Sequence, residues 1–465
     1  MKKIESFKRI MLLALSGTCL AGQIGIYAYY WLRYFYGENV RQYLEFWQKG
    51  QALVVAIYGI LLFFFSHMYG SMRVGYLKNV EIIFSQLLAT LFTNMITYGQ
   101  LSVMTTQLFP LTRYLPMTGL QLFWIIVWIP ISSVIYRNIF PPRKLLLVHG
   151  DRPIADIMEK FAGRKDKFEV SKCMHIGQGV DAIKKEAVER YDAVVLWDIS
   201  VQDRNQILKF CYGQSIRTYI MPKIPDVILK GAEELHLFDT PLLLTREYSL
   251  TIEQRFLKRF IDLFLALLLC ILTSPFMLLT ALAVKLYDRG PVFYKQVRCT
   301  LNNKQFSILK FRSMRVDAEK DGVARLAAKG DSRITPVGRV IRKVRLDELP
   351  QLFNILKGDM SFIGPRPERP EIIAKYLEVM PEFAFRTRVK AGLAGYAQVY
   401  GKYNTTPYDK LKLDLAYIEN YSVWLDLKLM LLTLKVLLWP DSTEGVDITQ
   451  ITALKEEQDD REGEA

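Results

Sequence analysis

Two adjacent acids, Asp347 and Glu348, have the residue types and spacing that best suit chemistry on a phosphate group. Arg342 shortly precedes them, and Arg366 follows within a stiff Gly-Pro-Arg-Pro turn at residues 364–367. Carboxylates bind Mg²⁺, and guanidinium groups bind phosphate through paired hydrogen bonds. The pattern therefore indicates phosphoryl chemistry with Mg²⁺. A solvated acidic pair on a helix surface is the commoner role for such residues.

The other metal-binding residue types offer no competing site. The five cysteines are scattered along the chain, and no two of them have CxxC spacing. The four histidines also lack the spacing of metal ligands. These observations argue against a disulfide framework and a zinc site, and they are consistent with a cytoplasmic location.

Positive charge is concentrated around the candidate residues. The chain of 465 residues has a net charge of +14, and residues 285–345 contain 16 Lys and Arg against 5 Asp and Glu, a local excess of 11. Basic surfaces attract nucleic acids, anionic lipids and phosphorylated substrates. Because an apolar segment directly precedes this region, we expect a lipid bilayer and phosphorylated partners, and no nucleic acid.

Four apolar stretches in the N-terminal third predict membrane-spanning helices. They cover about residues 10–32, 52–68, 82–104 and 119–137, lengths that suit the hydrocarbon core of a bilayer. Basic residues are most frequent before the first stretch, between the second and third, and after the fourth. The positive-inside rule therefore predicts a four-span helical bundle at residues 1–143 with both ends in the cytoplasm. The spans carry no charged pair at mid-depth, which disfavours a transporter.

A small parallel α/β domain with Rossmann-like element order is predicted at residues 144–247. Short apolar runs typical of strands alternate with helical patterns, as in folds built on a parallel sheet. A dinucleotide-binding loop would show GxGxxG after the first strand, whereas this chain has a single glycine, Gly150, in VHGDRP. We therefore expect a structural or dimerising module, and a homodimer as the assembly.

The third region, at residues 248–440, opens with an apolar run at 260–284 that Ser274-Pro275 interrupts. Proline inside a helix removes a hydrogen-bond donor and clashes with the preceding turn, so the helix should bend. It forms either a kinked spanning helix or a re-entrant hairpin, and the basic residues at both ends favour the hairpin. Beyond it we expect a compact domain on the membrane surface and an acidic disordered tail at residues 441–465.

Several motifs of the third region stand in the order found in one protein family. They are Ser274-Pro275, residues 290–298 (GPVFYKQVR), 310–314 (KFRSM), 346–351 (LDELPQ), 364–367 (GPRP) and 392–401 (GLAGYAQVYG). Together they resemble the bacterial sugar transferases, which are monotopic polyprenyl-phosphate hexose-1-phosphate transferases. The likeness extends over about residues 255–439, and the preceding spans with the α/β domain resemble the large subgroup of this family.

The resemblance implies a Mg²⁺-dependent enzyme of the bacterial inner membrane with its active site on the cytoplasmic face. Its substrates would be a UDP-hexose and undecaprenyl phosphate, and UMP would be released. Asp347 matches the nucleophile, which attacks the sugar-bearing phosphorus to form an aspartyl-phosphosugar. Glu348 matches the second acid of this Mg²⁺-binding dyad. The product would be the first lipid-linked sugar of an exopolysaccharide, capsule or O-antigen repeat unit.

The resemblance also implies where the substrate phosphates would bind. Arg366 matches the family's phosphate or uridine contact, presented by rigid prolines. The further candidates for substrate contact are Lys310, Arg312, Arg298, Arg342 and Gln398. A solvated basic surface is an equally frequent role for such residues taken singly. The basic residues around Asp347 should keep its carboxylate ionised, and Ser274-Pro275 matches the family's helix-breaking pair.

Departures from the family's pattern stand at Thr300, Asn303, Ala391, Ala394 and Lys402. Threonine tolerates a positive φ poorly, so the turn at Thr300 is expected to differ from that of the family. Because these loops would contact the nucleotide and the sugar, the sequence does not name the hexose. The alternative to an enzyme is a membrane scaffold or sensor of polysaccharide assembly, which would keep its function in an Asp347→Asn variant.

Overall fold

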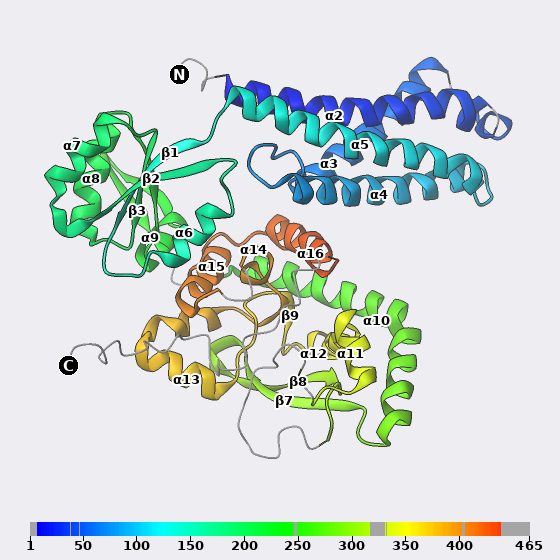
Figure 1. Ribbon diagram of the computed structural model, residues 1–465. Helices are drawn as coiled ribbons and strands as arrows, with labels where there is room; N and C mark the ends of the chain where they lie inside the picture. Colours follow the sequence, from blue (N-terminus) through cyan, green and yellow to red (C-terminus); the bar gives the residue numbers. More distant parts are fainter. Residues whose placement is uncertain are drawn as a thin grey trace. The chain divides into compact units, whose positions relative to one another are not determined.

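The computed structural model describes residues 7–37, 39–45, 47–245, 249–316, 331, 333–401 and 405–438 (Figure 1). The predicted tail at residues 441–465 and the departure at Lys402 lie outside these residues. The chain divides into two compact units, Met1–Pro222 and Lys223–Ala465. The domain boundary expected at residues 247–248 stays a prediction.

The first unit begins with four long apolar helices. They are α2 (Lys8–Tyr30, continued by the π-helix η1 at Trp31–Tyr36), α3 (Gln48–Tyr69), α4 (Asn79–Met104) and α5 (Leu111–Ile139). Each predicted apolar range lies within one of them, and all four are long and apolar enough to cross a membrane. Helix α5 begins earlier than predicted, directly after the extended Pro110, because its first turns are too polar for a hydropathy pattern to detect.

Hydrogen bonds between neutral side chains join the four helices inside this bundle. The Asn94 amide of α4 donates to Gln121 of α5 over 2.9 Å, and the Tyr58 hydroxyl of α3 donates to Asn94 over 3.0 Å. Thr90 of α4 donates to Gln23 of α2 over 2.6 Å. All of these residues are buried. In an apolar medium such bonds add to close packing, so they help to fix which helix faces meet.

A four-stranded parallel sheet follows in the same unit. Its strands are β1 (Arg143–His149), β2 (Phe168–His175), β3 (Ala193–Trp197) and β4 (Arg217–Ile220), in the spatial order β2-β1-β3-β4. Helices α6 (Ala155–Ala162), α7 (Val180–Glu189) and α8 (Val201–Gly213) connect them. Leu145 and Leu147 of β1 pack with α6, while Leu146 and Val148 pack with α7 and α8 on the other face. The predicted parallel α/β region is thus confirmed.

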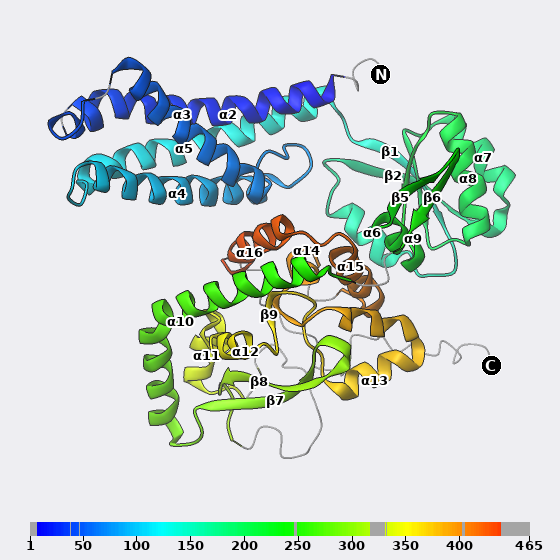
Figure 2. The same ribbon diagram turned by 180° about the vertical axis from the view of Figure 1, so that it is seen from behind.

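The second unit mixes helices with short sheets (Figure 2). Its helices are α9 (Ile224–Lys230), α10 (Ile252–Asp288), α11 (Pro336–Lys343), α12 (Gln351–Lys357), α13 (Pro370–Val379), α14 (Tyr396–Tyr400), α15 (Pro407–Glu419) and α16 (Val423–Leu437), with 3-10 segments η4 (Leu301–Asn303), η5 (Leu346–Glu348) and η6 (Pro381–Arg388). Strands β5 (Glu233–Leu237) and β6 (Thr240–Leu244) pair antiparallel, as do β7 (Phe293–Cys299) and β8 (Gln305–Phe311). Strands β9 (Ser361–Ile363) and β10 (Gly392–Ala394) pair in parallel.

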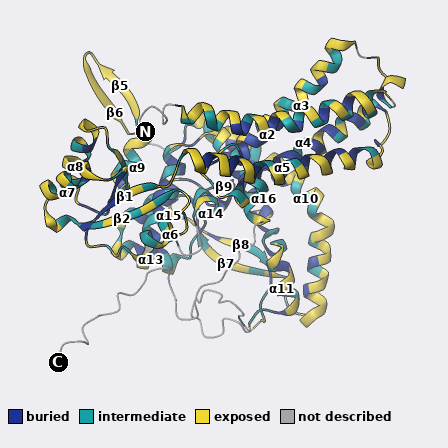
Figure 3. Cartoon of the chain, turned by 45° about the horizontal axis from the view of Figure 1, so that its top comes forward, coloured by how far each residue is buried: buried dark blue, intermediate teal, exposed yellow. Residues whose placement is uncertain are grey.

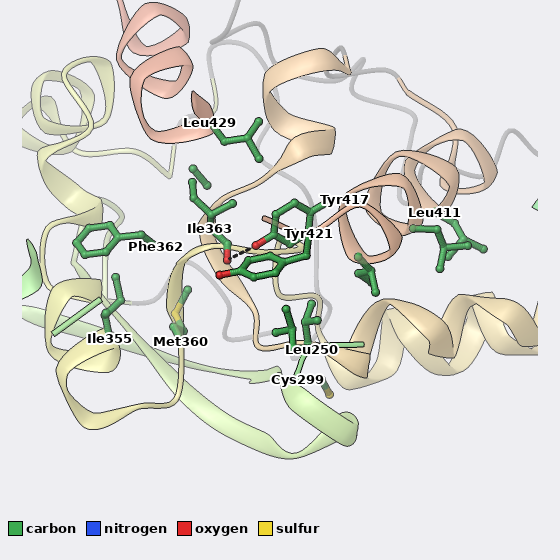
Figure 4. Close-up of a cluster of buried hydrophobic side chains, with 14 of the residues drawn as sticks. Leu250, Cys299, Ile355, Met360, Phe362, Ile363, Leu411, Tyr417, Tyr421 and Leu429 are labelled. Carbon is green, nitrogen blue, oxygen red and sulfur yellow. Dashed lines mark hydrogen bonds between the residues drawn. The ribbon is translucent and has the colours of Figure 1, made fainter. Parts of the chain in front are cut away.

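One apolar core holds the elements of the second unit together. It contains Ile308 of β8, Ile355 of α12, Ile363 of β9 and Leu429 of α16. Figure 4 shows Tyr417 of α15 within this cluster, where its hydroxyl lies 3.3 Å from the Ile363 carbonyl oxygen. Segments distant in the sequence are therefore fixed against one another, and the loops after α11 and β9 start from rigid positions.

Helix α10 has 37 residues and bends along its length (Figure 1). Pro275 lies inside it after Ser274, where the missing backbone N–H weakens the helix. Ala266 in its first half packs in the core, and Val284 near its end packs against Phe311 of β8. Much of the helix is exposed (Figure 3). The predicted bend is present. Both halves of α10 pack against other elements of the second unit.

Candidate active site

The Asp347-Glu348 pair lies in η5, one turn of 3-10 helix that follows α11. Arg345 before it has a left-handed backbone with a φ of 59°, a conformation that is costly for residues other than glycine. The Asp347 side chain is buried, and its Oδ1 atom has no hydrogen-bond partner among the described residues. A role as nucleophile or ligand would account for this unpaired oxygen.

Glu348 is approached by three cations at the same oxygen atom. Lys310 Nζ lies 3.1 Å from Glu348 Oε1, and Arg366 Nη2 lies 3.3 Å from it. Arg345 Nη1 lies 3.9 Å from the same oxygen. Lys310 belongs to β8 and Arg366 to the turn after β9, so Glu348 joins three separate segments of the fold. The hydrogen bonds to Glu348 among the described residues, from Lys310 and Arg366, both end at Oε1.

The two acids have pKa shifts in opposite directions. Burial raises the pKa of Asp347, and the charge of Glu348 raises it further against the effect of nearby cations. The cations therefore do not decide the direction of this shift, in contrast to the expectation from the sequence. Burial also acts to raise the pKa of Glu348, but Lys310, Arg366 and Arg345 outweigh it and hold that pKa well below its usual range. Glu348 is thus the more firmly ionised of the two.

Close backbone packing holds the turn at residues 364–367. A Cβ atom on Gly364 would lie 2.3 Å from the Lys390 carbonyl oxygen, so only glycine fits there. On the other side, Arg386 Nη2 donates a hydrogen bond to the Arg366 carbonyl oxygen over 3.1 Å. The backbone of Arg366 is therefore fixed, while its side chain stays 39% exposed.

Arg298, a predicted substrate contact, supports the same turn. Its Nη1 donates to the Pro367 carbonyl oxygen over 3.2 Å, and its Nε and Nη2 donate to Gln296 Oε1 over 3.1 and 2.6 Å. Burial lowers the pKa of Arg298 to about 10. Each of its donor nitrogens thus has an acceptor within the protein, which makes it a support of the turn in this structure.

The other residues predicted to contact the substrate lie on different elements and have different partners. Arg312 is buried and pairs with Asp288 at the end of α10. Arg342 lies in the last turn of α11 and acts on Asp347 through its charge. Gln398 lies on α14, and its buried Oε1 has no partner among the described residues. Of the predicted contacts, Lys310 and Arg366 therefore pair directly with Glu348, and Arg342 acts on Asp347 through its charge.

Glu368 follows the turn and lies in a second charged cluster. Lys410 Nζ lies 2.7 Å from its Oε1. Burial acts to raise the pKa of Glu368, but Lys410, Arg386 and Arg298 outweigh it and lower the pKa to about 2. A cavity of about 20 Å³ on this side of the turn is large enough for a single water molecule.

The stability that Glu368 contributes should be lost in acid. Its pKa of about 2 lies below the ordinary value of about 4.3, so the charged form stabilises the fold above about pH 4.5 and this effect fades as the pH falls toward 2. Glu368→Gln should melt below the wild type at pH 7, and the difference should shrink between about pH 5 and pH 3. The exposed Glu378→Gln is the control, and a difference that is constant with pH would contradict the expectation.

Three charged residues near the start of α10 tie this helix to the site. Asp262 Oδ1 accepts hydrogen bonds of 3.0 Å from Ser361 Oγ and from the Phe362 amide of β9. Arg259 donates to two carbonyl oxygens at the end of α12 over 2.6 and 2.8 Å. Lys258 is buried in a 2.5 Å ion pair with α16. These contacts hold α12, which follows the acidic pair, and β9, which precedes the Arg366 turn.

Sequence reasoning missed this role. Lys258 and Arg259 are among the basic residues before the apolar run at 260–284, which the sequence analysis uses only to orient the helix, and Asp262 has no role in it. The signal was present, because Asp262 is an acid within that run and lies one helical turn after Lys258. Buried charges in apolar surroundings need partners, so each of them points to a contact with another element.

Replacing Asp262 with alanine should destabilise the second unit by about 2 kcal/mol, because the buried Ser361 hydroxyl and Phe362 amide would lose their acceptor. Asp262→Asn keeps an acceptor oxygen and should lose less than half as much. Thermal unfolding of the full chain in detergent measures both losses. Equal destabilisation by the two variants would show that the hydrogen bonds are not the cause.

The departures at the β7–β8 turn cause no strain. Positive φ values fall on Asn302 (54°) and Asn303 (58°), which tolerate this conformation, whereas Thr300 stays extended. Thr300 Oγ1 donates to the Asp359 carbonyl oxygen over 2.8 Å and accepts from the Ala391 amide over 3.1 Å. Thr300 therefore links this turn to the segment that leads into β10.

The chain is similar to known proteins over the second unit. A family model described as bacterial sugar transferase matches residues 253–440. A UDP-N-acetylgalactosamine-undecaprenyl-phosphate N-acetylgalactosaminephosphotransferase of Aeromonas hydrophila is 39% identical over 259 residues, which are 54% of this chain and 59% of that protein. A UDP-glucose:undecaprenyl-phosphate glucose-1-phosphate transferase of Escherichia coli (strain K12) is 39% identical over 247 residues, 50% of this chain and 51% of that protein.

The chain thus spans only about half of the length of these two relatives. It covers more of a third, a UDP-glucose:undecaprenyl-phosphate glucose-1-phosphate transferase of Caulobacter vibrioides (strain ATCC 19089 / CIP 103742 / CB 15). The identity there is 42% over 190 residues, 40% of this chain and 71% of that protein. The matched range 253–440 contains the acidic pair and the three cations around Glu348. The chain therefore belongs to the bacterial sugar transferase family.

Proposed function

We propose that the protein transfers a hexose-1-phosphate from a UDP-sugar to undecaprenyl phosphate and releases UMP. The main support is the pair at η5, in which buried Asp347 has an unpaired oxygen beside Glu348 and its three cations. The names of the relatives, which act on undecaprenyl phosphate, agree with this reaction. The product would begin an exopolysaccharide, capsule or O-antigen repeat unit.

The transfer takes place in two displacements at one phosphorus atom. A carboxylate oxygen of Asp347 attacks the phosphorus that bears the sugar, and the bond from this phosphorus to the bridging oxygen breaks, so that UMP leaves with the electron pair. An oxygen of undecaprenyl phosphate then attacks the aspartyl-phosphosugar. A new P–O bond forms, the bond to Asp347 breaks, and the aspartate carboxylate is restored.

Lys310 and Arg366 bind the diphosphate in this proposal. Both lie within 3.3 Å of Glu348, which keeps the two cations together before substrate binds. Arg366 has a fixed backbone and a partly exposed guanidinium group, so it can contact a phosphate with little loss of conformational freedom.

We also propose that the acidic pair holds Mg²⁺. Asp347 Oδ1 is unpaired, and the cations near Glu348 all approach Oε1, so each acid retains an oxygen of the kind that Mg²⁺ takes as a ligand. The described residues contain no group of three or more His, Cys, Asp or Glu suited to a metal. Water and substrate phosphates would therefore complete the coordination. When bound, Mg²⁺ offsets the charge of the diphosphate.

The site is proposed to lie on the cytoplasmic face of the bacterial inner membrane. Both ends of α10 contact the second unit, which a helix crossing a bilayer would not allow, and this supports a re-entrant hairpin around Ser274-Pro275. Apolar side chains near the bend, such as Leu272 and Leu278, are exposed. Helices α2 to α5 would form four spans, with both ends of the bundle in the cytoplasm. A homodimer stays a prediction.

A panel of UDP-sugars labelled in the β-phosphate tests the function. Membranes that contain the full chain are incubated with each sugar, Mg²⁺ and undecaprenyl phosphate, and the lipid product and protein-bound label are measured. At least one UDP-sugar should give both. Absence of label in protein and in lipid with every UDP-sugar would rule out the proposal.

A further inference from the structure

Five cations from four segments lie where the helical bundle of the first unit adjoins its α/β domain. We call them the junction cluster: Lys8, Arg73, Arg143, Arg164 and Lys167. They come from the start of α2, the loop between α3 and α4, the start of β1, and the loop between α6 and β2. At this end of the bundle α2 and α4 begin, and α3 and α5 end. The cluster therefore lies at one end of four helices that are long and apolar enough to cross a membrane.

Tyr76 in the loop between α3 and α4 brings three of these cations together. Arg164 Nη1 donates a hydrogen bond to the Tyr76 carbonyl oxygen over 2.7 Å. Lys167 Nζ lies 4.1 Å from the centre of the Tyr76 ring, and Arg73 Cζ lies 5.9 Å from it. The bundle and the α/β domain thus share one cationic surface.

Among the described residues, the acid whose charge acts on Lys167 is Asp166, which is already paired. Asp166 is engaged by Arg164 through contacts of 3.1 and 3.2 Å. Lys167 is half-buried and, within the described residues, has neither a hydrogen bond nor an ion pair from its ammonium group, which lies over the rings of Tyr76 and Phe168. Burial, followed by repulsion from other cations of the cluster, lowers the pKa of Lys167 to about 8. An anion bound beside Lys167 would offset both the burial of its charge and the repulsion from the other cations.

Aromatic side chains lie beside the cluster, and they bear on whether the anion belongs to a lipid or comes from solution. Lys8 Nζ lies 5.3 Å from the centre of the Tyr136 ring and 4.9 Å from that of Phe140, at the end of α5. Tyr76 is itself exposed. Aromatic and basic residues at the ends of apolar helices are typical of the headgroup level of a bilayer. An anion carried by a lipid fits this setting better than a small anion from solution.

We propose that the junction cluster binds the phosphate headgroup of an anionic phospholipid and so ties the α/β domain to the bilayer surface. Lys167 would donate directly to a phosphate oxygen, and the neighbouring cations would add their charge. This site belongs to the first unit and does not depend on the transfer reaction proposed for the second.

Binding of a fluorescent phosphatidylglycerol to the full chain in a neutral detergent tests the proposal. Phosphatidylglycerol should bind more tightly than phosphatidylcholine, and Lys167→Gln should weaken its binding about five-fold. Lys167→Arg keeps the charge and should bind like the wild type. Lys165→Gln is the matched control, because it removes the same charge from an exposed neighbouring residue and should have little effect.

Three results would overturn the proposal. The first is equal affinity for phosphatidylglycerol and phosphatidylcholine. The second is equal weakening by Lys167→Gln and Lys165→Gln, which would indicate a non-specific charge effect. The third is inorganic phosphate that binds as tightly as the lipid with the same dependence on Lys167, which would assign the site to free phosphate. If Lys167→Gln does not fold, Arg73→Gln tests the same surface and should also weaken phosphatidylglycerol binding.

Discussion

Asp347→Asn should abolish the protein-bound phosphosugar and lower the rate of lipid-linked product at least ~10³-fold. An amide has nearly the shape of the carboxylate but lacks the charge with which the carboxylate attacks phosphorus. Asp347 is buried, and its Oδ1 has no hydrogen-bond partner in the described chain, so the substitution breaks no visible contact of that atom. The loss should therefore come from chemistry rather than from unfolding. The measurement is label retained on denatured protein after incubation with the β-phosphate-labelled UDP-sugar.

Two comparisons make this result decisive. Asp239→Asn changes an exposed aspartate in the turn between β5 and β6 and should label like the wild type. The melting temperature of Asp347→Asn should stay close to that of the wild type. Label of normal amount on a folded Asp347→Asn protein would show that another residue is the nucleophile. Retained biological function without any transfer would instead favour the scaffold alternative.

Glu348→Gln should impair both activity and stability. Its carboxylate neutralises Lys310, Arg366 and Arg345, and without it these cations repel one another beside the buried Asp347. Removing one partner of a fully buried ion pair costs about 3–5 kcal/mol, and the partial exposure of these side chains reduces the expected loss to about 2 kcal/mol. This corresponds to an apparent melting temperature lower by about 5 °C. Turnover should fall about 10²-fold or more, since a proposed Mg²⁺ ligand is lost.

A double variant separates the two effects of Glu348. Glu348→Gln with Lys310→Met removes one cation as well, so it should recover part of the melting temperature while staying inactive. Glu378→Gln, an exposed glutamate of α13, should change neither property. If Glu348→Gln were as stable and as active as the wild type, the cations would not depend on this carboxylate, and the proposed arrangement of the site would be wrong.

Elements with a strong local pattern were predictable from the sequence. The four apolar helices and the strands of the parallel sheet followed from hydropathy and from short buried runs, since such patterns depend on neighbouring residues alone. The bend of α10 followed from Ser274-Pro275 for the same reason. The acidic pair and the Arg366 turn attracted attention because of their residue types and their family resemblance.

Partners distant in the sequence were not predictable. Lys310, Arg312 and Arg298 looked alike as basic residues near β7 and β8, yet Lys310 reaches Glu348, Arg312 pairs with Asp288, and Arg298 supports the Arg366 turn. Only the packing of the second unit's core decides between these outcomes. The pKa of Asp347 could not be predicted either, because the neighbouring charges were visible in the sequence and the burial was not.

The contacts at the two ends of α10 bear on how such proteins are assembled in evolution. The acidic pair, the cations around Glu348 and the bent helix that is proposed to enter the membrane all lie within Lys223–Ala465. In the proposed function, this portion carries its own membrane attachment together with its chemistry. A gene segment encoding it could be joined to different N-terminal regions without rebuilding the site, and the bundle and α/β domain would then be additions that change regulation or assembly rather than the reaction.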